Sequence, residues 1–260
     1  MQNISITNDG PVTTVTLNRP QALNAITIEM HHELQAAFDR FAADEAQQVC
    51  VITGAGQRAF CAGSDVKAAA ASGGLPASYP KNGYAGLTER FDCPKPFIAA
   101  VNGLALGGGF EIALACDLII AVDHATFGLP EPLIGAIALG GGLHRLARQL
   151  PLKHAMGLIL SSRPLSAEAA LGLGLVNEVV LAGDLAGAVS RWCDDILRAS
   201  PVAIRTSKAV TLRGLGEGSV EQALRSQLEY PEFKRWRESE DLTEGLSAFA
   251  EKRPPKWTGR

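Results

Sequence analysis

The feature that most constrains the fold is the alternation of short apolar strands with helices. Val12–Leu17 has the β-branched alternation of a half-buried strand, and Cys50–Thr53 is a second short apolar run. Between them a helix is predicted over 27–44, with Thr27 as N-cap and an apolar stripe at helical spacing: Met30, Leu34, Phe38 and Phe41. Strand, helix and strand within about 45 residues indicate a parallel crossover unit, and hence an α/β fold.

The same alternation recurs in the middle of the chain. The N-terminus enters a strand at once, and further strands are predicted over 94–101, 118–121 and 125–127, with a helix over 110–116. The segment 68–87 is rich in Ala, Gly, Ser and Pro and is expected to be a loop insertion.

Beyond residue 140 the chain is predicted to be mostly helical. Helices are expected over 142–150, 153–161 and 166–173, then a strand over 176–180, an amphipathic helix over 185–196, a helix that begins near Ser219 and a last one over 241–249. No sharp linker interrupts the sequence, so one domain over 1–260 is expected. Its β-rich core would reach about residue 195, and a helical region over about 196–260 would pack on itself or on neighbouring subunits.

Composition excludes several classes of protein. With 47% apolar residues, 20% charged residues and a net charge of −3, the chain can bury a large core and is not a generic nucleic-acid binder. The longest apolar runs, 97–101 and 117–122, are too short for a membrane helix. The N-terminus shows no targeting signal, and the five cysteines form no CxxC pair, so we expect a cytoplasmic protein without a metal site.

Glycine is concentrated in one stretch. Nine of the 27 glycines fall within residues 103–142, where an even spread would place about four. Glycine permits unusual backbone angles and close approach of the main chain to another group. P-loop, Rossmann, HExxH and GxSxG motifs are absent from the sequence, so the glycines need another interpretation.

Two glycine-containing segments are candidate anion sites. In Phe60–Lys67 a tight turn at Gly63 would expose the backbone N–H of Ser64 to a ligand, although an ordinary strand-to-helix turn would look the same. Gly107–Gly109 would open a helix whose unpaired N–H groups could hold an oxyanion; close helix packing is the alternative.

Two glutamates are candidate proton carriers. Glu111 follows Gly108 by one turn of the predicted helix. It could be a solvated first-turn residue, but the apolar residues 112–115 after it indicate a buried helix. Glu131 follows a predicted strand in a proline-flanked loop, and such a pair could act as base and acid.

The remaining titratable residues give weaker signals. His31 and His32 are expected on the surface of the first helix, and His144 and His154 are expected to be ordinary surface or core residues. Cys61 has no His or Asp at a spacing that would activate it as a nucleophile.

Four segments, in this order and spacing, resemble the enoyl-CoA hydratase (crotonase) family: LNRPQALNA (17–25), FCAGSDVK (60–67), VNGLALGGGFE (101–111) and FGLPE (127–131). The likeness continues through ALGLGLVN (170–177) and EGLSAFAEKR (244–253). It implies a crotonase-like ββα superhelix with a helical C-terminal trimerisation region, in a homotrimer or a dimer of trimers.

The resemblance also implies an activity and its residues. The backbone N–H groups of Ser64 and Gly108 would form an oxyanion hole for an acyl-CoA thioester. Both glutamate positions of the hydratases are occupied, by Glu111 and Glu131, so hydration of an enoyl-CoA is expected, with the choice of acid and base left open. Isomerases and hydrolases of the family commonly lack one glutamate. No cofactor is expected, because coenzyme A is part of the substrate.

The coenzyme A contacts implied by the resemblance lie in three places. One is the loop with Gln21, Ala22, Leu23 and Ala25; the second is the turn with Ala62, Gly63, Asp65, Val66 and Lys67; the third is Phe249 and Lys252, which would reach the coenzyme A of a neighbouring subunit. The sequence departs from the family at Pro132 and at Ala138-Leu139, where relatives usually have Pro-Gly, and this puts the acyl pocket in question.

Within the family, GYAGLTE (83–89), Phe110-Glu111 and AFAEKR (248–253) are most similar to carnitinyl-CoA (crotonobetainyl-CoA) hydratases. Other possibilities are an isomerase, a hydrolase, or a non-catalytic RNA-binding relative. The last would need a basic stripe, but residues 231–260 hold seven Lys or Arg against six Asp or Glu. Neither a nucleic acid nor a membrane is therefore expected as a partner.

Overall fold

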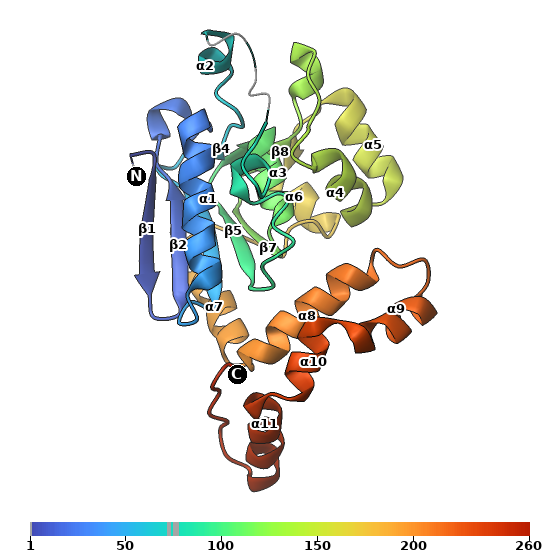
Figure 1. Cartoon of the computed structure of the whole chain (residues 1–260). Coiled ribbons are helices and arrows are strands. Elements are labelled where there is room, and N and C mark those ends of the chain that lie inside the picture. Colours follow the sequence, from blue (N-terminus) through green and yellow to red (C-terminus); the bar gives the residue numbers. More distant parts are fainter. Residues whose placement is uncertain (1, 72–73, 75–77) are drawn as a thin grey trace. The chain divides into compact units, whose positions relative to one another are not determined.

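The computed structural model describes residues 2–71, 74 and 78–260. It divides into two compact units (Figure 1). The first holds the chain up to Phe91 and Phe97–Ser190, and the second holds Asp92–Pro96 and Arg191–Arg260. The first unit therefore ends inside a helix, α7 (Leu185–Leu197), a few residues before the boundary near residue 195 that the sequence suggested.

The first unit is built on a six-stranded sheet in the order β1-β2-β3-β5-β7-β10. β1 pairs antiparallel with β2, and every other pairing in this sheet is parallel. The strands are β1 (Ile4–Asp9), β2 (Val12–Leu17), β3 (Val49–Gly54), β5 (Phe97–Val101), β7 (Leu118–Val122) and β10 (Glu178–Val180). The predicted crossover unit is confirmed, because β2 and β3 are parallel neighbours joined by helix α1 (Ile28–Ala43).

α1 forms where the sequence predicted it. The Thr27 hydroxyl accepts a hydrogen bond from the Met30 backbone N–H and caps the helix. Phe38 and Phe41 on its apolar face meet Phe97 of β5 edge to face, with ring centroids 5.6 and 5.3 Å apart. The core of this unit therefore lies between α1 and the parallel strands.

A second sheet of four strands, ordered β4-β6-β8-β9, determines where functional residues can meet. β4 (Ala59–Cys61), β6 (Leu104–Leu106) and β8 (Thr126–Gly128) run parallel, and β9 (Leu165–Ser166) is antiparallel to β8. β6 was not predicted, because a three-residue strand carries little periodic signal. The carboxyl ends of the three parallel strands lie at one edge, so the segments that follow them converge.

The expectation of a loop over residues 68–87 is wrong in part. Helix α2 (Val66–Ala71) extends into it, and Tyr84–Gly86 forms the 3-10 turn η2. Residues 72–73 and 75–77 of this segment lie outside the described residues. The strands expected from residues 94 and 176 begin later, at Phe97 and Glu178.

The other helices of the first unit are α3 (Gly108–Ala115), α4 (Gly142–Gln149), α5 (Leu152–Ser161) and α6 (Ala167–Gly172), with short 3-10 turns η1 (Pro20–Ala22), η3 (Glu131–Ile134) and η4 (Ala182–Asp184). The second unit contains the end of α7, then α8 (Pro201–Gly214), α9 (Val220–Ser226), η5 (Gln227–Glu229), α10 (Pro231–Arg237) and α11 (Glu240–Glu251). α8 and α10 were not predicted, although each begins with proline at its first position, a recognisable start signal. No described helix combines the length and the apolar character needed to cross a membrane.

Candidate active site

Three candidate segments follow the parallel strands of the second sheet. Ala62–Ser64 comes after β4, Gly107–Glu111 after β6, and Leu129–Glu131 after β8. The registers Cys61↔Ala105 and Leu106↔Gly128 align the ends of these strands. The tertiary structure therefore brings the two candidate oxyanion turns and both glutamates to one edge.

The turn at Gly63 presents the Ser64 N–H. The Gly63 carbonyl accepts from the Ile26 N–H at 2.8 Å, and the Asp65 N–H donates to the Ile26 carbonyl at 2.9 Å, so the turn is held on both sides of Ser64. Gly63 has φ +91°, and a Cβ there would lie 2.9 Å from the Leu106 carbonyl oxygen. No described residue accepts a hydrogen bond from the Ser64 backbone N–H.

At the start of α3 the glycines allow close packing, and the oxyanion site expected there stays a prediction. A Cβ on Gly109 would overlap the Cys61 carbonyl, so close packing requires a glycine there. Gly108 is the first residue of α3, where backbone N–H groups have no partner within the helix. A Cβ placed on Gly63 would lie 3.2 Å from the Gly108 nitrogen, which puts the two turns side by side.

Glu111 is buried, with 3% of its surface exposed, so the solvated alternative is wrong. Its Oε1 accepts a hydrogen bond from the Gly142 N–H at 2.8 Å, at the start of α4. Cβ atoms on Gly140 and Gly142 would lie 2.7 and 2.9 Å from its carboxylate oxygens. Burial raises the pKa of Glu111 to about 7, against the lowering effect of the backbone hydrogen bond from Gly142.

Glu131 is the first residue of η3. Its Oε1 lies 3.0 Å from where a Cβ of Gly107 would be, which places it beside the start of α3. Its Oε2 is buried and has no hydrogen-bond partner among the described residues. Burial raises the pKa of Glu131, and the charge of Glu131 in turn raises the pKa of Glu111.

Burial disfavours the charged form of both carboxyl groups, and the charge of Glu131 further disfavours ionisation of Glu111. A pair that holds a single proton offers one carboxylate that can accept a proton and one carboxylic acid that can donate one. The buried Oε2 of Glu131 has no hydrogen-bond partner among the described residues, so a partner for it would have to come from a ligand or water. Among the described residues, no three His, Cys, Asp or Glu side chains gather as metal ligands would.

The first two groups of candidate coenzyme A residues are adjacent in space. The Ala62 N–H donates to the Leu23 carbonyl at 3.0 Å, which ties the loop 19–25 to the turn after β4. Asp65 is already engaged: its carboxylate pairs with Arg19 at 3.0 Å and accepts from the Ala68 N–H at 3.1 Å. Arg19 also donates to the Ala25 carbonyl at 2.7 Å.

The Asp65 carboxylate is thus engaged within the chain, and its contact with coenzyme A stays a prediction. Gln21, Val66 and Lys67 are exposed, and Ala22 is half-buried. Asn24, which sequence reasoning did not single out, is fully buried and anchors the loop by donating to the carbonyls of Ala55 and Ala59.

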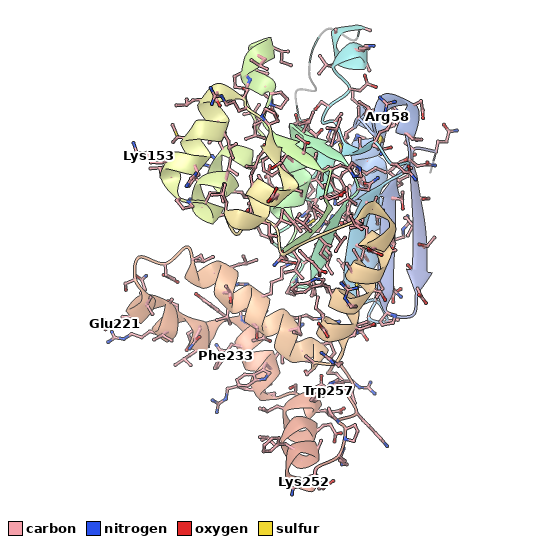
Figure 2. The ribbon with its side chains drawn as sticks, turned by 180° about the vertical axis from the view of Figure 1, so that it is seen from behind. Arg58, Lys153, Glu221, Phe233, Lys252 and Trp257 are labelled. Atoms are coloured by element: carbon pink, nitrogen blue, oxygen red, sulfur yellow. The ribbon has the colours of Figure 1, made fainter. Side chains whose placement is uncertain are left out.

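Phe249 and Lys252 belong to the second unit. Phe249 is 88% exposed on α11, and Lys252 is the C-cap of that helix, labelled in Figure 2. Their contact with coenzyme A across subunits stays a prediction.

The expectation for His31 is wrong, whereas His32 is exposed as expected. His31 is 4% exposed, and its Nδ1 accepts a hydrogen bond from the Ala85 N–H at 2.9 Å. A signal was available, because His31 lies at i−3 from Leu34 and i−7 from Phe38, on the apolar face. Burial lowers the pKa of His31 to about 4, so the ring is neutral near pH 7.

Cys61 is not an activated thiol. It is completely buried, and burial raises its pKa to about 12. A nucleophilic cysteine needs a lowered pKa, so thiolate chemistry at this turn is excluded at neutral pH.

Comparison with known proteins gives consistent likenesses over the whole chain. A family model described as enoyl-CoA hydratase/isomerase matches residues 7–260. Carnitinyl-CoA dehydratases of Proteus mirabilis and Salmonella arizonae are 42% and 41% identical over 263 residues; they cover 100% and 99% of this chain, which spans 99% of each. Enoyl-CoA hydratase structures from Mycobacterium marinum and Mycobacterium tuberculosis match with TM-scores of 0.92 and 0.91 at 38% and 36% identity, each covering 100% of both chains.

Proposed function

The chain belongs to the enoyl-CoA hydratase/isomerase family, and on that premise we propose that it adds water reversibly across the 2,3-double bond of an enoyl-CoA thioester. The likeness to solved enoyl-CoA hydratases confirms the expected α/β crotonase-like fold. The observation that carries the proposed reaction is the pairing of the buried Glu111 with the half-buried Glu131, whose Oε2 is buried, beside two free backbone donors at one sheet edge.

In the proposed reaction the thioester carbonyl accepts hydrogen bonds from the N–H groups of Ser64 and Gly108. Addition of water to C3 moves negative charge onto this oxygen, and fixed donors at a helix N-terminus stabilise that charge. The support is that both N–H groups lie at adjacent turns and lack described partners.

The two glutamates complete the proton balance. The carboxylate of the pair takes one proton from the attacking water as its oxygen bonds to C3, and the carboxylic acid delivers its proton to C2. One proton is taken and one is given, so the pair ends the cycle with its single proton on the other member. Dehydration of a 3-hydroxyacyl-CoA is the same sequence in reverse.

Substitution of each glutamate by glutamine tests this scheme. Glu111→Gln and Glu131→Gln should each lower kcat for a short enoyl-CoA by at least about 100-fold, because general acid–base catalysis typically contributes that much. Loss of the enoyl absorbance follows the reaction. Glu168→Gln, on the surface of α6, is the matched control and should keep the wild-type rate. Either site variant with wild-type kcat would refute the two-carboxylate scheme.

The proposal includes assembly into a homotrimer or a dimer of trimers. It also includes a cytoplasmic location and a reaction that needs no cofactor, because coenzyme A is part of the substrate. Large apolar side chains that are exposed within residues 133–160 support self-association: Leu133, Ile134, Ile137, Leu139, Leu152, Met156 and Leu160. Sedimentation of the intact protein measures its oligomeric state.

A second candidate is carnitinyl-CoA dehydration, which the names of the full-length relatives favour. Its substrate has a quaternary ammonium group, and aromatic faces bind such cations. Tyr79 supplies a half-buried ring close enough to Glu111 for the carboxylate to raise the pKa of the phenol, after burial as the larger cause. Parallel assays with crotonyl-CoA and crotonobetainyl-CoA decide between the two substrates.

The same assays distinguish a hydratase from an isomerase, a hydrolase or an RNA-binding protein. Migration of the double bond without hydration would indicate an isomerase, and release of free coenzyme A would indicate a hydrolase. RNA binding at physiological salt with no activity toward any enoyl-CoA would reverse the proposal, although the near-balanced charge of residues 231–260 argues against it.

A further inference from the structure

Tyr84 touches both residues that carry the candidate oxyanion donors. Its hydroxyl is hydrogen-bonded to the Ser64 hydroxyl at 3.1 Å. Its ring packs directly against the backbone of Gly108, because a Cβ on Gly108 would overlap the ring at Cζ and the hydroxyl oxygen. Ser64 and Gly108 come from segments 44 positions apart in the sequence, so Tyr84 links two donors that no backbone hydrogen bond joins.

Tyr84 is itself held rigidly. It is 2% exposed in the turn η2, and its ring meets the His31 ring edge to face with centroids 4.7 Å apart. The next residue, Ala85, has φ +55°, which is unusual for a residue other than glycine, and its N–H donates to His31. A backbone conformation of this kind persists only where surrounding contacts fix it.

The hydroxyl of Tyr84 is not needed for packing. A phenylalanine would fill the same space, and a buried hydroxyl costs free energy unless it finds a partner. The partner found here is the side chain of Ser64, whose backbone N–H is the donor in question. A hydrogen bond at this place restrains the side chain of Ser64 and with it the direction of its N–H.

We propose that Tyr84 is a positioning residue for the oxyanion hole, which fixes the Ser64 and Gly108 donors relative to each other. The inference rests on the proposed function, since it assigns a role within that reaction. Oxyanion stabilisation depends on donors that are already oriented when charge develops, and small displacements of catalytic groups cost large factors in rate. In this proposal Tyr84 acts through its two neighbours, Ser64 and Gly108.

The test compares hydration kinetics of Tyr84→Phe, Ser64→Ala and the double variant. Tyr84→Phe keeps the ring and removes only the hydroxyl, so kcat should fall about 3- to 10-fold with KM nearly unchanged, as expected for loss of one neutral hydrogen bond that acts in the transition state. Ser64→Ala removes the other half of the same hydrogen bond and should give a similar fall. The double variant should be no slower than the slower single variant.

A spectroscopic measurement isolates the oxyanion hole from the proton transfers. The C2 protons of a 3-ketoacyl-CoA lie between two carbonyl groups and are acidic, so a bound 3-ketoacyl-CoA should ionise in part to its enolate. The enolate absorbance then reports how well the hole stabilises negative charge on the thioester oxygen. The enolate fraction should fall in Tyr84→Phe and in Ser64→Ala alike. Tyr230→Phe is the matched control: it removes a hydroxyl that bonds to Glu217 at 3.2 Å in the second unit and should leave kcat and the enolate fraction unchanged.

The outcomes separate this inference from the proposed function. If the wild type is active, two results would overturn the role of Tyr84. One is a wild-type kcat and enolate fraction in Tyr84→Phe, and the other is additive effects on kcat in the double variant. A wild type that does not hydrate enoyl-CoA would refute the proposed reaction, and the enolate measurement would still decide the role of Tyr84. If Tyr84→Phe does not fold, Ser64→Ala decides alone: unchanged kcat and enolate fraction would overturn the inference.

Discussion

Replacement of His31 by asparagine should flatten the pH dependence of stability. The Asn Oδ1 can take the place of the His31 Nδ1 that accepts the Ala85 N–H, but an amide cannot be protonated near neutral pH. The variant loses the ring contact with Tyr84 and so should be less stable at pH 7. The informative quantity is the difference in free energy of unfolding between wild type and variant, followed as the pH falls.

The magnitude follows from the pKa of His31, which burial lowers from 6.5 to about 4 in the folded protein. Between these two values the unfolded chain binds a proton that the folded chain does not. Stability therefore falls with falling pH across this window, by about 1.4 kcal/mol per pH unit. Between pH 7 and pH 5 this single histidine should cost the wild type about 2 kcal/mol that the asparagine variant does not lose.

Urea unfolding at pH 7, 6 and 5, at one protein concentration, measures this difference. Glu111 contributes with the opposite sign, because its pKa is raised to about 7, but it is present in both proteins and cancels in the comparison. His154→Asn, at an exposed position of α5, is the control and should keep the wild-type slope. If the free energy of unfolding changes with pH by the same amount in wild type and in His31→Asn, the assignment of a buried, neutral histidine is refuted.

Two further substitutions test contacts in each unit. Gly108→Ala would drive a methyl group into the Tyr84 ring and displace the proposed oxyanion donor, so kcat should fall at least about 100-fold. A rate within a factor of two of wild type would contradict this packing. Asp241→Ala in the second unit removes the buried carboxylate that accepts the Ser200 hydroxyl at 2.7 Å and the N–H groups of Thr258 and Gly259 at 2.7 and 3.1 Å. Thermal unfolding should show a loss of about 2–4 kcal/mol, and an unchanged Tm would mean that these groups find water instead.

The sequence alone determined many of the local elements and indicated the residues of the candidate site. The strand over 12–17, the helix capped by Thr27 and the helix opened by Gly107–Gly109 follow from periodicity, capping and glycine placement, which are local properties of the chain. The glycine cluster also indicated close approach of backbone to functional groups, and the structure shows this at Gly109, Gly140 and Gly142.

Only the tertiary structure decided which of these elements meet. The strands β4 and β6 are three residues long and owe their existence to pairing with each other and with β8, an interaction between segments more than 20 residues apart. Burial is equally non-local: it placed His31 inside, left Glu131 Oε2 without a described partner and put Tyr84 between Ser64 and Gly108. Residue types and spacing identify the groups that can do the chemistry, but their distances and pKa values depend on packing across the whole first unit, since desolvation and close contact arise only when distant segments come together.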